Sequence, residues 1–171
     1  MAVPGVTPTL TATFAATYGG AATPSAASGT VVAGPQGGSN DRCYRIEFAN
    51  PEPNNEATIT ITFNRAARDV NFTILDIDAT NNNGYRDSVA VLTPGFTATP
   101  GPRVIGAGTA TNPFQMNTPY ANIDPTSAMG NLGLAWAGPL TSVSFRYFQP
   151  DVNANSANMV VGMSGIGVNP C

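Results

Sequence analysis

Alternation of apolar and polar side chains with a period of two is the feature that most constrains the fold of this chain. It is clearest at residues 57–63, where Ile59, Ile61 and Phe63 alternate with threonines. A period of two places successive side chains on opposite faces of an extended strand, whereas an amphipathic helix needs a period of about 3.6 residues. The sequence therefore predicts β-strands. The same pattern recurs at residues 44–48, 70–74 and 143–147.

Glycine and proline occur between most of these runs, and residues 64–69, which contain neither, are expected to connect the runs 57–63 and 70–74. The chain has 18 Gly and 15 Pro in 171 residues, and no helical period of useful length is found in it. About ten short strands joined by such turns fit a two-sheet antiparallel β-sandwich of jelly-roll type. The hydrophobic fraction of 42% argues against disorder of the whole chain. We therefore expect an all-β fold.

The distribution of charge divides the chain into two parts. Residues 1–40 contain no charged residue and form an N-terminal arm, and residues 41–171 form the β-sandwich domain. Within the arm, residues 9–17 alternate as a strand does. Three interpretations stay open: this strand pairs within its own sheet, the arm is a flexible linker, or the strand pairs with a neighbouring molecule, because uncharged edges invite such pairing.

The types of charged residue exclude several classes of function. All seven positive charges are arginines, and the chain has neither lysine nor histidine. A Schiff base, a Ser-His-Asp triad and a His-ligated zinc site are therefore excluded. The net charge of −3 offers no electrostatic footprint for nucleic acid, and no apolar run approaches the length of a membrane span. We expect no nucleic-acid partner and no membrane insertion.

Two cysteines, Cys43 and Cys171, lie far apart in the sequence. In a chain of this composition they predict an oxidising compartment and one disulfide, which would stabilise the fold by about 4–5 kcal/mol in the chain-entropy model. The alternative is two unrelated thiols. Residues 1–5 lack the basic and apolar regions of a signal peptide, so we expect a processed segment of an extracellular protein.

Three carboxylates surround a loop rich in asparagine. Asp76 and Asp78 share the parity of the apolar residues of the preceding strand and are therefore expected to face inward. A buried carboxylate without a partner is costly, so something must compensate the charge. Calcium is one candidate, because Asp76, Asp78, Asp87 and a loop carbonyl near Asn81 or Asn82 could supply the hard oxygen ligands that it prefers.

A second interpretation of the carboxylates stays open beside calcium. If the strand ends at Leu75, the aspartates lie in a turn, where they bond backbone N–H groups or pair with Arg86. A third interpretation is a glycosidase that uses two of these carboxylates. No second acid lies in an evidently apolar pocket, so we predict that the chain is not an enzyme.

The same segment resembles a known type of module. Residues 72–78 read FTILDID and residues 85–91 read YRDSVAV. This pair of segments is similar to one found in jelly-roll modules of large secreted bacterial surface proteins, often actinobacterial. The resemblance covers about residues 43–171 and does not cover the first 40. It implies an extracellular β-sandwich with a structural or binding role and no defined catalytic activity.

These observations predict a non-catalytic extracellular module, structural or adhesive in role and with calcium as a candidate stabilising ion, that meets a protein or glycan partner on a surface. One alternative is a self-assembling subunit of a filament or surface layer, joined by strand addition through the uncharged arm. Another is a carbohydrate-binding module, because jelly rolls often bind sugars through exposed aromatic side chains. The candidates for such contacts are Tyr85, Tyr120, Trp136 and Tyr147.

Overall fold

The computed structural model describes residues 9–49, 55–80, 84–150 and 158–171. In these residues the chain contains strands and no helix, which confirms the predicted all-β class. It follows that the described part has no helix long and apolar enough to span a membrane. Its strands are β1 (Ala12–Gly19), β2 (Thr23–Pro24), β3 (Val31–Val32), β4 (Cys43–Ala49), β5 (Glu56–Leu75), β6 (Ser88–Val91), β7 (Phe96–Pro100), β8 (Val104–Ile105), β9 (Phe114–Met116), β10 (Leu132–Trp136), β11 (Leu140–Phe148), β12 (Asn158–Met163) and β13 (Gly167–Pro170).

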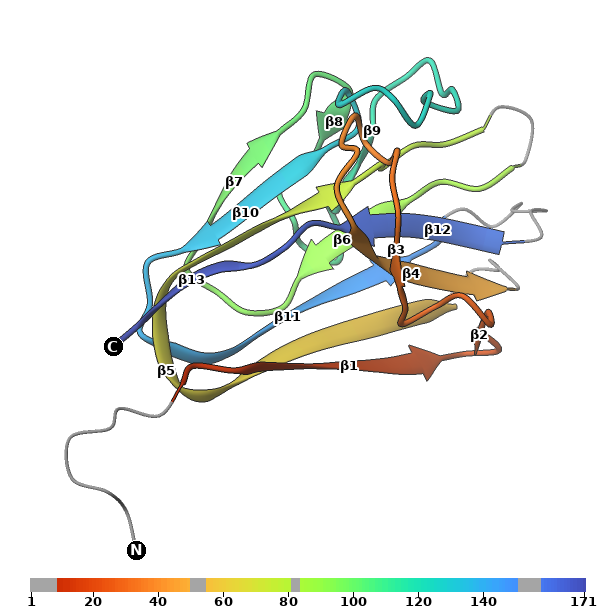
Figure 1. The fold of residues 1–171 in the computed structure, drawn as a ribbon. Helices are drawn as coiled ribbons and strands as arrows, with labels where there is room; N and C mark the ends of the chain where they lie inside the picture. Colours follow the sequence, from red (N-terminus) through yellow and green to blue (C-terminus); the bar gives the residue numbers. More distant parts are fainter. Residues whose placement is uncertain (1–8, 50–54, 81–83, 151–157) are drawn as a thin grey trace, which may run out of the picture.

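The 20-residue strand β5 connects the whole sheet. Its first half lies between β1 and β11, and its second half lies between β10 on one edge and β12 and β13 on the other (Figure 1). All of these pairings are antiparallel. Around the first half, the sheet extends through β11 to β6, β9 and β8; around the second half, it extends through β10 to β7 and through β12 to β4.

A bend inside β5 was not anticipated from the sequence. The polar run at residues 64–69 looked like a connection between two strands, yet the strand continues through it. Inward residues have odd numbers from Ala57 to Phe63 and even numbers from Val70 to Ile74, so the parity changes within the bend. Asp69 takes a positive φ of 52° there, and the register of β11 shifts between Leu140 and Ser142. An irregularity of this kind bends a strand and re-aims its side chains.

The bend lets both halves of β5 contribute to one hydrophobic core. Aromatic rings from the two parts of the sheet meet in it: the ring centroids of Phe48 on β4 and Tyr147 on β11 lie 5.5 Å apart, and those of Phe72 on β5 and Phe145 on β11 lie 5.8 Å apart. Such contacts between facing surfaces of a folded-over sheet are consistent with a β-sandwich.

The described part of the N-terminal arm belongs to the same sheet. β1 pairs along its whole length with the first half of β5, and the short strands β2 and β3 pair with β4. The half-buried ring of Phe14 stacks on Tyr44 with 5.0 Å between centroids. Of the three interpretations of the arm, pairing within its own sheet is therefore the one found for residues 12–19.

The predicted disulfide is wrong, because Cys43 and Cys171 are both free thiols. Cys43 lies against Gly162, which pairs with Leu75 at the end of β5. Cys171 donates its backbone N–H to the carbonyl of Ala66, at the bend. Nine residues of extended strand span on the order of 25–30 Å, whereas a disulfide needs Cα atoms within about 7 Å. The spacing of the two cysteines in the sequence does not indicate how far apart they lie in the fold.

The two thiols should differ sharply in reactivity. Cys171 is exposed, whereas Cys43 is 2% exposed and burial raises the pKa of its thiol. We expect a thiol reagent to modify one cysteine in the native protein and the second one only after unfolding. A reductant should leave the melting temperature unchanged. A protein that has no titratable thiol until it is reduced, and that melts lower afterwards, would contradict this arrangement.

Candidate functional site

The carboxylates flank a narrow neck at which β5 and β6 approach each other. An antiparallel bridge joins Ala79 to Arg86, and the N–H of Asp87 donates to the carbonyl of Asp78 at 2.9 Å. Asp78 and Asp87 are therefore directly opposite each other across the neck. The two predicted loop ligands, Asn81 and Asn82, lie outside the described residues.

Asp78 and Asp87 form a buried carboxyl pair, with 4% and 0% exposure. Oδ2 of Asp87 accepts the N–H of Asp78 at 3.1 Å, and Oδ1 accepts the hydroxyl of Tyr147. Oδ2 of Asp78 accepts the N–H of Ile123 at 2.9 Å, and Tyr85 and Asp87 also hydrogen-bond to this carboxylate. Burial raises the pKa of both carboxyls, most strongly that of Asp87. We infer that the pair shares one proton, since two opposed charges would repel.

Asp76 has no comparable set of partners. It leaves the strand with a positive φ of 69°, and its backbone N–H donates to Oδ1 of Asn131 at 3.3 Å. Its own Oδ1 is buried and has no hydrogen-bond partner among the described residues. Burial raises the pKa of Asp76 to about 6, and the nearby negative charges of Asp78 and Asp124 add to this effect. Asp76 is the carboxylate whose charge the described residues leave uncompensated.

The described residues do not form a ready-made metal centre. They contain no group of three His, Cys, Asp or Glu side chains that could hold a metal ion. The interpretation in which aspartates bond backbone N–H groups holds for Asp78 and Asp87, which also use tyrosine hydroxyls. The guanidinium of Arg86 lies over the ring of Tyr120 at 4.7 Å from its centroid. A cation at the neck would therefore depend mainly on Asp76.

The aromatic residues considered as sugar contacts are not gathered on one surface. Tyr85 belongs to the carboxyl network, and Tyr120 lies under Arg86. Trp136 is 2% exposed, contacts Phe72 in the core and donates Nε1–H to the carbonyl of Thr93 at 3.2 Å. Trp136 is therefore a core residue and not a surface contact.

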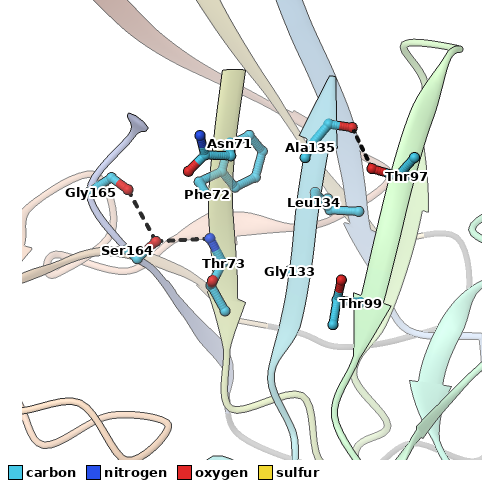
Figure 2. A pocket seen from close by; sticks show the side chains of 10 residues that line it. All are labelled: Asn71, Phe72, Thr73, Thr97, Thr99, Gly133, Leu134, Ala135, Ser164 and Gly165. Carbon is cyan, nitrogen blue, oxygen red and sulfur yellow. Dashed lines mark hydrogen bonds between the residues drawn. The ribbon is translucent and has the colours of Figure 1, made fainter. Parts of the chain in front are cut away.

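A groove of about 260 Å³ lies on the outer face of β5, β10 and β7 (Figure 2). Two rows of paired residues cross its floor, Thr73–Gly133–Thr99 and Asn71–Ala135–Thr97. Ser164 and Gly165, which follow β12, close it on the side of β5. Its lining is uncharged and rich in hydroxyl groups. The lining residues are Asn71, Phe72, Thr73, Thr97, Thr99, Gly133, Leu134, Ala135, Ser164 and Gly165.

Small residues give the groove its depth. A Cβ atom on Gly133 would meet its nearest protein atoms, both of Thr99, at 3.5 Å, which is ordinary contact. The packing of the protein therefore does not require glycine there. Some polar groups are already used, because Ser164 Oγ accepts the N–H of Thr73 at 2.8 Å. The hydroxyls of Thr73 and Thr99 have no hydrogen-bond partner in the described part of the chain and face the groove.

Sequence reasoning missed both the groove and the tyrosine of the carboxyl pair. Tyr147 was considered as an exposed sugar contact, whereas it is fully buried and its hydroxyl donates to Asp87, a partner to which nothing in the sequence pointed. The groove combines residues of three strands, so that only the pairing of the strands reveals it. The feature of the groove that the sequence does show is the alternation at residues 96–99, where the polar Thr97 and Thr99 share the outward face of the strand.

Comparison with known proteins adds no further guide to the site. No family model, no curated protein and no solved structure matches this chain. The resemblance to jelly-roll modules of bacterial surface proteins therefore stays a prediction. The features of the molecule that bear on its function are the carboxyl pair, the groove and the edges of the sheet.

The neck should make the protein more stable in mild acid. The pKa of Asp76 is about 6 in the folded chain against an ordinary value of 3.8, and the pKa values of Asp78 and Asp87 are also raised. A carboxyl of this kind stabilises the fold below its ordinary pKa, and the contribution is lost as the pH rises through the folded pKa. With EDTA present, we expect the melting temperature to rise from pH 7.5 to pH 5.

Asp76→Asn is the matched variant for this experiment, because asparagine tolerates a positive φ and cannot titrate. The rise in melting temperature near pH 6 should be smaller in this variant than in the parent chain. A parent chain that loses stability between pH 7.5 and pH 5 would show that the carboxyls at the neck are not held in raised-pKa environments.

Proposed function

We propose that this chain is a non-catalytic structural or adhesive β-sandwich module that acts outside the cell. The observation that carries the proposal is the carboxyl network at the neck. Its acids accept hydrogen bonds from Ile123, Tyr85 and Tyr147, and so join the end of β5 to β11 and to the loop before β10. These ionisable groups hold strands together and are not directed at a substrate.

The spacing of the two buried acids supports a non-catalytic role. Glycosidases place their two carboxyls about 5 Å apart or more, with the substrate between them. Asp78 and Asp87 hydrogen-bond to each other, and both are buried. A sugar ring has no room between them. The fold alone carries no chemistry, so the placement of this pair is what favours a non-catalytic role.

Calcium remains part of the proposal through Asp76. The unpartnered Oδ1 of this carboxylate and the charges of Asp78 and Asp124 make a locally negative neck. A hard cation would bind such oxygens and relieve their repulsion. A proton on Asp76 would relieve the same repulsion. The two explanations can be distinguished at a pH above the pKa of Asp76, where the carboxyl has lost its proton and can still bind a cation.

Carbohydrate recognition is the second candidate function, and the groove favours it. The uncharged hydroxyls of Thr73 and Thr99 stand on either side of a small floor residue, Gly133. Hydroxyl and amide groups suit the hydrogen bonds of a neutral sugar chain. The groove has no exposed aromatic ring for stacking, so we propose weak binding of the kind that becomes adhesive when many modules are displayed together.

Self-association through the N-terminal arm is the third candidate. Because β1 already pairs with β5, its strand cannot be donated to a neighbour without leaving its own sheet. Association would therefore use the free edge of β1, which keeps the β1–β5 pairing intact. A dimer of this kind would also bring two grooves into one particle.

Calcium should raise the melting temperature at pH 7.5, where Asp76 is ionised. A ligand present at a hundred times its dissociation constant stabilises the fold by about 2.7 kcal/mol. Calorimetry with calcium, with magnesium and with EDTA measures the effect, and Asp76→Asn should abolish it. Identical melting in calcium and in EDTA would remove calcium from the proposal and leave the carboxyl pair in place.

Gly133→Val should abolish sugar binding and leave the fold stable. Valine suits a strand and would fill the floor of the groove, where a Cβ meets only ordinary contacts. Affinity electrophoresis in gels that contain neutral polysaccharides measures the retention of the protein. We expect the retention of the parent chain to be lost in this variant.

Ser142→Val is the control, because Ser142 is an exposed strand residue on β11, away from the groove. It should migrate as the parent chain does in every gel. A parent chain that no neutral polysaccharide retards would end the carbohydrate proposal. Equal retardation of the parent chain and Gly133→Val would move the binding site away from this groove.

A further inference from the structure

Strand β1 has one unprotected edge. Among the described strands it pairs with β5 alone, and it lies at the margin of the molecule (Figure 1). Natural sheet edges are usually protected by charged residues, proline or bulges. The sequence of β1, ATFAATYG, contains no charged residue and no proline, and its pairing with β5 runs without a register shift.

The free edge carries a regular set of backbone groups. The N–H of Asn64 donates to the carbonyl of Thr11, so odd-numbered residues of this strand are the ones that exchange hydrogen bonds with β5. The even-numbered residues therefore direct their backbone groups away from β5. They are Ala12, Phe14, Ala16 and Tyr18, and each offers one N–H and one C=O.

We propose that a second copy of this chain pairs with this edge, β1 to β1 and antiparallel, about a two-fold axis through Ala15. In this register Phe14 hydrogen-bonds to Ala16 of the second copy, and Ala12 pairs with Tyr18 of the second copy. All the outward backbone groups of the four even-numbered residues find partners. The proposal rests on the self-association candidate above and names both the partner and the register.

The side chains of the even residues select this register. About Ala15, each large inward side chain, Phe14 or Tyr18, meets an alanine of the second copy. A shift of the axis to Phe14 would set two phenylalanines opposite each other, and a shift to Ala16 would set Phe14 opposite Tyr18. The inward face is crowded because Phe14 already stacks on Tyr44, so a large residue opposite a small one fits there with less rearrangement than two large rings.

An apolar groove beside the edge supports a strand-shaped occupant. It measures about 320 Å³ and is lined by Phe14, Val31, Tyr44, Met163 and Ile166, with Arg42 as its charged member. Val31 is 52% exposed, although it is apolar. Tyr18 of the second copy would lie opposite Ala12, next to Phe14 and on the same inward face. Its ring stays on the core of its own chain, with its hydroxyl 2.9 Å from Ser28 Oγ, so the groove would lie beside the added strand.

The outer face is equally self-complementary. Ala15 meets Ala15 of the second copy, and Thr13 meets Thr17, so no charge is buried or opposed. A two-fold interface of this kind is closed and produces a dimer, not a filament. Pairing at this edge therefore specifies the form of self-association. It is a dimer in which the sheets of the two copies become continuous.

Cysteine crosslinking tests the register directly. Ala15→Cys in a Cys171→Ser background should form a disulfide-linked dimer under mild oxidation, because opposed residues of a non-hydrogen-bonded pair have Cα atoms about 4.5 Å apart. Thr13→Cys alone should not crosslink, and a mixture of Thr13→Cys with Thr17→Cys should. Efficient crosslinking of Thr13→Cys alone would overturn the register.

Light scattering and sedimentation of the full chain test the dimer itself. Ala15→Lys places two like charges opposite each other and should weaken dimerisation by about fivefold or more, with unchanged melting temperature, because Ala15 is exposed in the single chain. Ser142→Lys, an exposed residue away from the edge, should dimerise as the parent chain does. A parent chain that stays monomeric at millimolar concentration overturns the proposal and leaves the structural and sugar-binding proposals intact.

Discussion

The bend in β5 is the constraint on which the rest of this structure depends. Phe63 and Val70 both face the core although one position is odd and the other even, which a regular strand does not allow. Without the change of parity, the second half of β5 would turn Phe72 and Ile74 to solvent and bury Asn71 and Thr73. The irregularity at Asp69 and the matching shift in β11 prevent this. One strand can therefore line the same core from two parts of the sheet.

The bend also explains why buried acids occur at the far end of β5. With the second half of the strand fixed against β10 and β12, the neck with β6 must close in one register. The carboxyl pair meets its donors from Tyr147 and Ile123 only when Asp78 lies opposite Asp87. A slip by one residue would leave a buried charge without partners, which is far more costly than the loss of one apolar contact. We infer that the pair specifies register more than it adds stability.

Local patterning predicted the strands well, and its failures have physical causes. Alternation identified β1, β4, β11 and both halves of β5, because each has one face directed at the core. It did not show that residues 57–63 and 70–74 belong to one strand, since the polar residues between them look like a turn and the positive φ of Asp69 has no sequence signal. Parity correctly placed Asp78 inside. Tyr147, which donates its hydroxyl to Asp87, is 60 residues away from it along the chain, and the rows of the groove join three strands, so neither could be found without the pairing of the strands.

Charged side chains in this molecule take part in contacts within the fold, whereas the surfaces proposed to bind a partner are uncharged. Ion pairs and buried acids lie within the fold, as in the pairs Arg45–Glu47 and Arg146–Glu56 and at the neck. The groove is uncharged, and so is the edge of β1. Recognition through neutral hydroxyls and backbone groups is little affected by salt, because screening acts on charges. It also gives no long-range attraction, so association would be slow and would depend on high local concentration. Dense display on a surface would supply that concentration, and this is the physical reason why the proposed structural or adhesive role suits a chain with so few charges.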